Sequence, residues 1–325
     1  MIARRDFIAL LGGAAAWPLA ARAQQSMPVV GFVNGASPVA GRADAFRKGL
    51  SAAGFIEGQN VTVEYHWLDG QFDRLPSLMT DLVRRRVAVI ATPAFNLGAQ
   101  AAKAATSMIP IVFGVGNDPV KLGLVASLAR PGGNATGINI FVQEVEAKRL
   151  GLLHELVPKA VRIAVLVNPA NPPVAESTLP VITAAARTIG LQIQALKAST
   201  SGEIDATFAA LARDRADAVF VSSDVFFLGR RVQFATLTAR DRIPAAYASR
   251  DYVEAGGLMS YGADVVDSFR QVGAYTGQIL KGTKSADLPV LQATKFEFVI
   301  NWQTARALGL EVPSGVLSIA DEVIE

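Results

Sequence analysis

The side chains best suited to bind a small molecule stand at or near the ends of short apolar runs of this sequence. They are amide, hydroxyl, acidic and phenolic residues, namely Asn34, Ser37, Thr92, Asn117, Asp118, Asn168, Asp224, Tyr247 and Tyr261. Hydroxyl groups and helix N-termini can hold a carboxylate, an acid can pair with an ammonium group, and a ring can cover an apolar tail. The set therefore suits a small zwitterion or carboxylate.

Each of these residues also has a structural interpretation. Asn, Ser and Asp are common in strand-to-helix turns, so the polar residues can serve the loops in which they stand. Tyr247 and Tyr261 can point into a cleft or into a core. The adjacent Phe226 and Phe227 suit a lid over a cleft, or burial under the next helix. The sequence leaves these alternatives open.

The apolar runs themselves predict parallel strands. They are rich in β-branched residues, alternate with helical stretches, and cover residues 28–33, 61–67, 87–92, 109–114, 162–167, 191–196, 217–222 and 243–248. Parallel strands need a helical crossover between them, so the fold class is α/β, with two doubly wound parallel-sheet lobes joined by a hinge. In such sheets ligands bind beyond the carboxyl ends of the strands, where the polar residues above stand.

The alternation of strands and helices breaks at three places, which divide the chain into lobes. We expect residues 28–138 and 263–288 in an N-terminal lobe, and residues 139–262 and 289–325 in a C-terminal lobe. The predicted helix 264–281 has apolar residues at three- and four-residue steps, so one side of it is buried. Gly273 and Gly277 within it would allow a neighbouring helix to approach closely.

Composition excludes several classes of protein and of chemistry. The chain has 325 residues, of which 51% are hydrophobic and 18% charged, with no cysteine and two histidines. Disorder, disulfides and thiolate catalysis are excluded, and we expect no metal and no cofactor, with His66 and His154 as structural or surface residues. A phosphate-binding loop, a nucleophile elbow and a complete dinucleotide fingerprint are absent from the sequence. We therefore expect no enzyme.

Residues 1–23 have the three parts of an export signal. Arg4 and Arg5 precede an uncharged stretch from Phe7 to Ala21, and Ala21-Arg22-Ala23 resembles a signal-peptidase site. The uncharged stretch is shorter than the ~20 residues of a membrane-spanning helix. The paired arginines resemble a twin-arginine signal, which predicts a periplasmic protein cleaved near Ala23. A buried or amphipathic N-terminal helix is the alternative.

The charge that remains after residue 23 is nearly balanced. Arg4, Arg5, Arg22 and Asp6 are lost with the signal, which leaves 28 basic and 27 acidic residues. This balance argues against nucleic acid or an anionic membrane surface as the main partner.

Two long stretches resemble a known family. Residues 118–137, and residues 294–313 followed by 320–325, resemble the ABC-transporter substrate-binding proteins of the tryptophan/tyrosine type. The resemblance extends over essentially the whole chain after the signal. It implies a type I periplasmic-binding-protein fold and a receptor that delivers a solute to an ABC permease in the inner membrane. A monomer is expected.

The resemblance also implies a site between the lobes. The positions that match are Thr92, Asn117 and Asp118 in the first lobe, Asn139 at the crossing, and Asp224, Tyr247 and Tyr261 on the other side. The implied ligand is an amino acid or an aromatic or branched carboxylate, bound by closure of the hinge.

Three other functions compete with a transport receptor. An enzyme with the same cleft, a hydrolase or isomerase, would use Asp118 and Asp224 as an acid and base pair. A transcription regulator on this scaffold would need a basic helix-turn-helix at the N-terminus, where the export signal stands. A receptor for signalling rather than uptake remains open.

Overall fold

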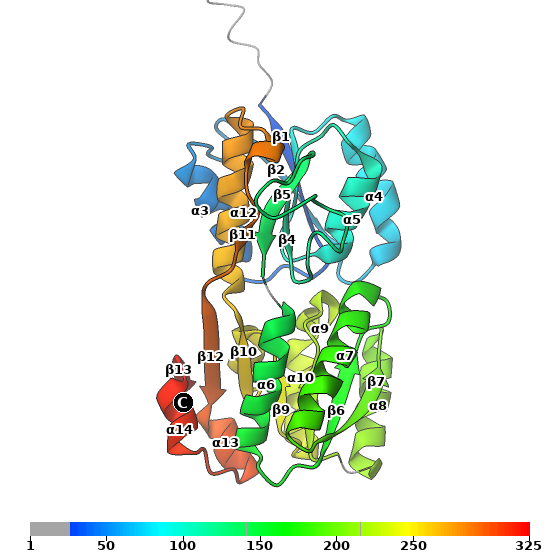
Figure 1. The fold of residues 1–325 in the computed structure, drawn as a ribbon, viewed down its shortest axis with the longest axis vertical. Helices are drawn as coiled ribbons and strands as arrows, with labels where there is room; N and C mark the ends of the chain where they lie inside the picture. Colours follow the sequence, from blue (N-terminus) through cyan, green and yellow to red (C-terminus); the bar gives the residue numbers. More distant parts are fainter. Residues whose placement is uncertain (1–26, 141, 215) are drawn as a thin grey trace, which may run out of the picture.

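The computed structural model describes residues 27–140, 142–214 and 216–325, with the side chains of residues 142–144 and 212 left out. The predicted export signal lies outside the described residues. Figure 1 shows two α/β lobes, one above the other, and the predicted fold class is confirmed.

The N-terminal lobe is a parallel sheet with helices on both faces. Its described strands lie in the order β11-β5-β4-β3-β1-β2, and every pair is parallel. The strands are β1 (Val29–Asn34), β2 (Thr62–Trp67), β3 (Val89–Thr92), β4 (Ile111–Val115), β5 (Ala135–Asn139) and β11 (Leu291–Gln292). The helices are α3 (Arg42–Ala52), α4 (Leu75–Arg84), α5 (Asn96–Ala105) and α12 (Val265–Leu280), with short 3-10 turns at Phe72–Arg74 and Ser285–Asp287.

The C-terminal lobe repeats this design with one departure. Its described strands lie in the order β13-β12-β10-β9-β8-β6-β7, and β12 runs antiparallel to β10. The strands are β6 (Arg162–Val167), β7 (Gln192–Lys197), β8 (Ala218–Val221), β9 (Ala245–Tyr247), β10 (Met259–Ala263), β12 (Phe296–Asn301) and β13 (Glu322–Ile324). The helices are α6 (Val142–Leu156), α7 (Pro172–Thr188), α8 (Ser201–Asp214), α9 (Val225–Gly229), α10 (Arg231–Asp241), α11 (Arg250–Glu254), α13 (Trp302–Leu308) and α14 (Ser314–Ile319).

Each sheet is buried on both faces, which explains the continuous apolar runs of its strands. In β1, Val33 packs in one core cluster and Phe32 in another, because neighbouring side chains of a strand point to opposite faces. Ile163 and Ala164 of β6 likewise pack in two different core clusters. The strands therefore end in buried positions, and only the loops that follow them reach the space between the lobes.

Three connections join the lobes in the part of the chain that the structure describes. The first follows Asn139 and the second follows Ala263. The third lies later than the expected residue 289, because Leu291 and Gln292 pair with β5 of the first sheet. The backbone N–H of Val290 also donates to the carbonyl of Leu128 there.

Helix α12 returns the chain to the N-terminal lobe and packs closely on α3. A Cβ added at Gly273 would lie 2.1 Å from the carbonyl oxygen of Phe46, and one added at Gly49 would lie 1.9 Å from that of Arg270. A Cβ added at Gly277 would lie 2.4 Å from the methyl carbon of Ala53. The close approach predicted from Gly273 and Gly277 is therefore confirmed.

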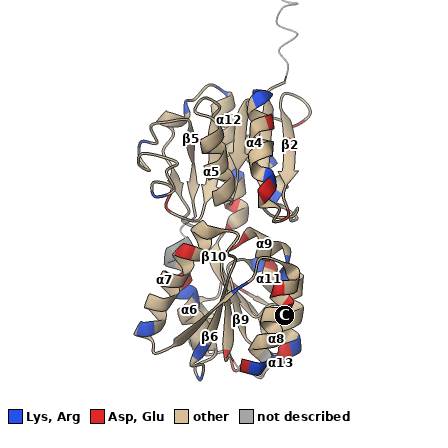
Figure 2. Cartoon of the chain, turned by 90° about the vertical axis from the view of Figure 1, so that its right-hand side faces the viewer, with Lys and Arg blue, Asp and Glu red and all other residues tan. Residues whose placement is uncertain are grey.

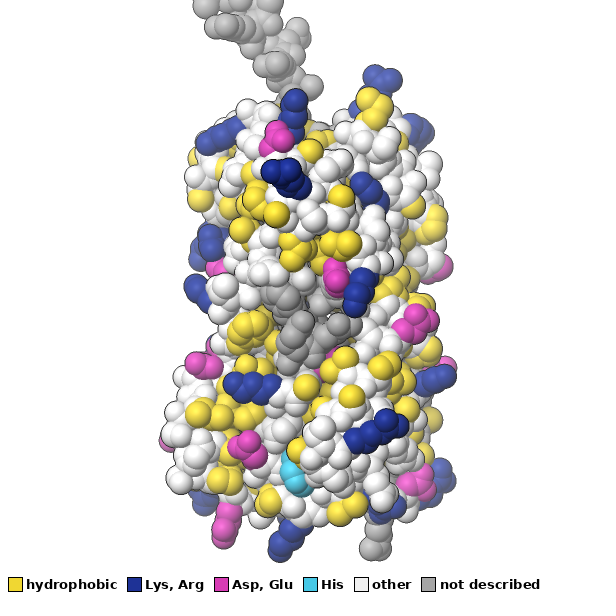
Figure 3. Space-filling model, viewed as in Figure 1, with side chains coloured by type: hydrophobic (Ala, Val, Ile, Leu, Met, Phe, Trp, Pro, Cys, Tyr) yellow, Lys and Arg dark blue, Asp and Glu magenta, His cyan; other side chains and the backbone are white. Residues whose placement is uncertain are grey.

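Basic and acidic side chains are interspersed on both lobes on the faces shown in Figures 2 and 3. This pattern agrees with the balanced charge of the sequence after residue 23. Within the described residues, no helix combines the length and the apolar character needed to cross a bilayer.

Candidate ligand-binding site

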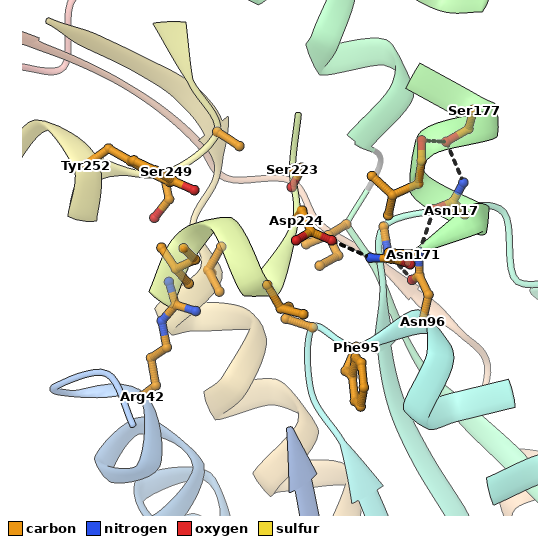
Figure 4. Close-up of a pocket in the computed structure, with 18 residues that line it drawn as sticks. Arg42, Phe95, Asn96, Asn117, Asn171, Ser177, Ser223, Asp224, Ser249 and Tyr252 are labelled. Carbon is orange, nitrogen blue, oxygen red and sulfur yellow. Dashed lines mark hydrogen bonds between the residues drawn. The ribbon is translucent and has the colours of Figure 1, made fainter. Parts of the chain in front are cut away.

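A pocket lies between the two lobes, beyond the carboxyl ends of strands from both sheets (Figure 4). Loops after β3 and β4 and the start of α3 line it from the N-terminal lobe, and loops after β6, β8 and β9 line it from the C-terminal lobe. Its lining includes Arg42, Phe95, Asn96, Asn117, Ile140, Asn171, Val174, Ser177, Ser223, Asp224, Val225, Leu228, Ser249, Tyr252 and Val265.

The N-terminal side of the pocket is built by the turn between β3 and α5. Ala94 adopts a left-handed backbone conformation, with φ at 52°, which few non-glycine residues do. The next residue, Phe95, is buried, and its N–H donates to the carbonyl of Gly114. This strained turn places the Phe95 ring and the first residue of α5, Asn96, against the pocket.

An asparagine pair extends from this turn to the other lobe. Asn96 Nδ2 donates to Asn117 Oδ1 at 2.6 Å, and Asn96 Oδ1 accepts from the N–H of Gly116 at 3.0 Å. Asn117 Nδ2 then donates to the carbonyl of Pro173 at 3.0 Å and to Ser177 Oγ at 2.9 Å, both on α7. Asn117 is therefore an interlobe contact as well as a residue that lines the pocket.

Asp224 is the centre of the polar network on the C-terminal side. Its carboxylate accepts from Asn168 Nδ2 at 3.1 Å, from Asn171 Nδ2 at 2.7 Å, and from the N–H groups of Phe226 and Phe227 at 3.0 and 3.1 Å. It thus caps the N-terminus of α9. Burial raises the pKa of Asp224, although these hydrogen bonds favour the ionised form.

The network leaves two acceptors available to a ligand. Three of the four donors to the Asp224 carboxylate share its Oδ1, whereas its Oδ2 accepts only from Asn171. Because Asn171 gives its Nδ2 to Asp224, its Oδ1 acts only as an acceptor; it is buried and has no hydrogen-bond partner among the described residues. A solute N–H group can therefore be held by Asn171 Oδ1, beside the ammonium contact expected of Asp224.

An ion pair closes the opposite end of the pocket. Arg42 Nη2 of α3 lies 2.7 Å from Asp251 Oδ2 of α11, and both side chains are largely buried. Burial opposes the ionisation of Asp251, but Arg42 and the Ser249 hydroxyl outweigh it and keep the pKa of this carboxyl below its usual value. A second pair between the lobes, Arg230 with Asp69, is more exposed and spans 3.1 Å.

Residues 26–324 match the family described as ABC transporter substrate binding protein. The chain belongs to this family. Among the relatives of this substrate-binding protein is a tyrosine-binding protein of Clostridioides difficile strain R20291. The two are 27% identical over 271 residues, which are 82% of this chain and 76% of the relative.

Two solved structures resemble the substrate-binding protein over 92% of its length and 100% of theirs. One is a conserved domain protein of Vibrio cholerae, with 27% identity and a TM-score of 0.82. The other is an ABC domain from Streptococcus pneumoniae in complex with L-Trp, with 24% identity and a TM-score of 0.80. The latter likeness supports the fold alone.

The structure brings two of the predicted site residues, Asn117 and Asp224, into the lining of the pocket. Asn168 stands behind them and donates to Asp224. Ser37 is absent from the pocket lining, and its Oγ donates to Asp69 Oδ1 at 2.5 Å, which orients the partner of Arg230. Asn139, buried at the end of β5, directly precedes Ile140, which lines the pocket.

Three other predicted site residues, Asn34, Thr92 and Asp118, lie outside the lining of the pocket. Asn34 Nδ2 donates to the carbonyl of Pro93, and its Oδ1 accepts from the N–H of Ala36. Thr92 is fully buried at the end of β3. Asp118 Oδ1 accepts from the N–H of Val120 in a turn. Asp118 is absent from the pocket lining. The acid and base pair with Asp224 that the alternative enzyme hypothesis requires is therefore not formed in the pocket.

The two predicted tyrosines also lie outside the pocket. Tyr247 is fully buried and stacks on Tyr252, with ring centroids 4.5 Å apart, and it is Tyr252 that lines the pocket. Tyr261 packs in the C-terminal lobe, where the Lys148 ammonium lies 4.8 Å from its ring centroid. Adjacent strand residues point to opposite faces, so a position near a strand end does not by itself direct a side chain to the cleft.

The adjacent phenylalanines do not form a free lid. Phe226 and Phe227 are buried in the core of the C-terminal lobe. Phe226 also touches the N-terminal lobe, because a Cβ added at Gly70 would lie 2.6 Å from its ring. No group of three or more His, Asp or Glu residues in the described part of the chain is arranged to hold a metal ion.

A buried acid of helix α6, Glu146, gives a pH prediction. Burial raises the pKa of Glu146 from 4.5 to about 7, against the opposing effects of Arg149 and Thr178. The free energy of unfolding contributed by this group is therefore fully present below about pH 4.5 and falls as pH rises to about 7, by roughly 2–3 kcal/mol. We expect Glu146→Gln to remove this decline in urea-unfolding profiles measured across that range.

The control for this prediction is Glu155→Gln, an exposed acid on the same helix. It should reproduce the wild-type profile. A Glu146→Gln profile parallel to the wild-type profile would mean that the carboxyl titrates normally in the folded protein.

Proposed function

We propose that this substrate-binding protein is the extracytoplasmic receptor of an ABC importer and encloses one small amino-acid-like solute between its lobes. The observation that supports the proposal most strongly is the unpartnered acceptor of Asn171 in a pocket with Phe95, Val174 and Leu228 on its walls. A buried acceptor calls for a donor, and apolar walls call for an apolar side chain. An amino acid supplies both.

One relative supports the same class of ligand. It is called a tyrosine-binding protein. The pocket offers two aromatic residues, Phe95 and Tyr252, against which a ring can pack. We therefore place aromatic and branched amino acids first among the candidate solutes.

The interlobe contacts provide the means of closure. Asn117 with α7, Arg42 with Asp251 and Arg230 with Asp69 can all form only when the lobes are together. A solute that touches both lobes favours this closed form by its differential affinity for it. A change from mostly open to mostly closed needs about 5.5 kcal/mol of that difference.

We further propose that the protein reaches the periplasm through the twin-arginine signal, is cleaved near Ala23, and acts as a monomer that delivers its solute to a permease. N-terminal sequencing of the exported protein tests the cleavage. A mature chain that begins near Gln24 is expected, and a chain that retains Arg4 and Arg5 contradicts the signal.

The binding function is tested by native mass spectrometry of the gently purified mature protein, followed by a thermal-shift panel of the common amino acids. We expect one bound small molecule per chain and stabilisation by an aromatic or branched amino acid. A chemically altered product after incubation, or the absence of any ligand-dependent stabilisation, contradicts the proposed receptor.

The Arg42–Asp251 pair gives a prediction for affinity. Arg42→Met leaves Asp251 without its partner in the closed form, whereas water can hydrate Asp251 in the open form. We expect the stabilising amino acid to bind at least about tenfold more weakly in isothermal titration calorimetry. Arg47→Met, on the exposed side of α3, is the matched control and should bind like wild type. Equal affinity of both variants would show that the Arg42–Asp251 ion pair does not stabilise the bound state.

A further inference from the structure

A buried arginine borders the pocket on the side of the C-terminal lobe. Arg149 of α6 is 1% exposed, and its guanidinium lies 4.3 Å from the ring centroid of Phe220. It lines a small hollow together with Ile140, Val145, Ser223, Ala248, Gly262, Ala263 and Val265. Four of these residues, Ile140, Ser223, Ala248 and Val265, also line the interlobe pocket, so the two spaces adjoin.

The contacts of Arg149 leave most of its hydrogen-bonding capacity unused. Glu146 Oε1 is 3.9 Å from Nη2, which is beyond hydrogen-bond distance. Nη1 reaches the carbonyl of Tyr261 only at 3.4 Å. Nε and Nη2 are buried and have no hydrogen-bond partner among the described residues. A buried guanidinium with three unused N–H donors on two nitrogens is costly unless an anion approaches it.

We propose that the hollow at Arg149 is an oxyanion subsite of the pocket and that it receives the carboxylate of the solute. The inference rests on the proposed function and narrows it, because it requires an acid as the solute and assigns the residue that recognises it. The guanidinium presents a planar fork that matches the two oxygens of a carboxylate. Its surroundings are mostly apolar, with the Ser223 hydroxyl as a further polar group, so water competes weakly for the contact.

Arg149 and Asn171 then recognise different groups of the same amino acid. Arg149 holds the carboxylate, and the Asn171 Oδ1 atom accepts from the ammonium group. Glu146 Oε1 accepts from the Thr178 hydroxyl at 2.8 Å and lies 3.9 Å from Arg149 Nη2, so Glu146 forms no hydrogen bond with this nitrogen. The arginine is thereby left for a ligand.

The test compares matched ligands in isothermal titration calorimetry of the full mature protein. One series is L-tyrosine, tyramine and 3-(4-hydroxyphenyl)propionate, and the other is L-leucine, 3-methylbutylamine and 4-methylpentanoate. In the series whose amino acid binds, we expect the amine, which lacks the carboxylate, to bind at least about tenfold more weakly than the amino acid. The deaminated acid should bind better than the amine.

Variants test the residue itself. Arg149→Met combined with Glu146→Gln removes both ionisable groups together and keeps the side-chain volumes similar, whereas Glu146→Gln alone keeps Arg149. The double variant should bind the amino acid at least about tenfold more weakly than the single variant, while the affinity for the amine is unchanged. The comparison of ligands on the wild-type protein stands even if the double variant does not fold.

The outcomes separate the inference from the proposed function. An amine that binds as tightly as its amino acid, or a double variant with undiminished affinity, overturns the subsite and leaves the amino-acid receptor intact. If no compound of either series binds, the proposed solute class is contradicted and the subsite with it.

Discussion

Asp224→Ala is expected to destabilise the C-terminal lobe by about 3–5 kcal/mol, as well as to abolish solute binding. The substitution removes the cap of α9 and leaves the amides of Asn168 and Asn171 buried without their acceptor. The loss arises because several buried donors share this one carboxylate. Urea unfolding followed by circular dichroism measures it.

Asp224→Asn is the informative control. It keeps an acceptor for the N–H groups of Phe226 and Phe227, but turns an N–H group toward Asn171. We expect a smaller loss, about 1–3 kcal/mol. If Asp224→Ala unfolds like wild type and loses only affinity, the carboxylate serves the ligand directly, and the view of Asp224 as the organiser of the loops is wrong.

Gly273→Ala is expected to cost at least about 3 kcal/mol of folding free energy. The added methyl group would lie 2.1 Å from a backbone oxygen, which cannot rotate away, so α3 and α12 must separate. That separation opens the core around Phe46 and Phe269. The measurement is again urea unfolding of the ligand-free protein.

The matched control is Gly202→Ala, in helix α8, where an added Cβ meets no atom within 4 Å. Alanine is the better helix former, so this variant should be more stable by about 0.5–1 kcal/mol. Equal stability of Gly273→Ala and wild type would show that the two helices are not packed as closely as described.

Much of the fold could be predicted because burial on both faces of a sheet leaves a clear apolar pattern. The run at residues 162–167 coincides with β6, and the expected helix 264–281 is α12 with Asp264 as its cap. The short strand β11 escaped prediction, because two residues make no pattern, and its pairing moved the third crossing. The antiparallel β12 also follows from contacts that no local sequence pattern reveals.

The site could be predicted only in part, because strand ends identify loops but not the direction of side chains. Asn117 and Asp224 were found in this way, whereas Tyr247 points into the core and Tyr252 takes its place at the pocket. Arg42 was missed because its partner Asp251 is far away in the sequence. Asn171 directly precedes Pro172, the first residue of α7. Proline is common at the first position of a helix, so this pair of residues could have identified Asn171 as a helix-start residue rather than an ordinary turn residue.

The central claim, that one solute is held by groups of both lobes, is tested most directly by a crystal structure of the mature protein with the amino acid that stabilises it. We predict density for the solute between Phe95 and Asn171, with a solute N–H group within hydrogen-bond distance of Asn171 Oδ1. Density elsewhere on the surface, or contacts with one lobe only, would contradict the account.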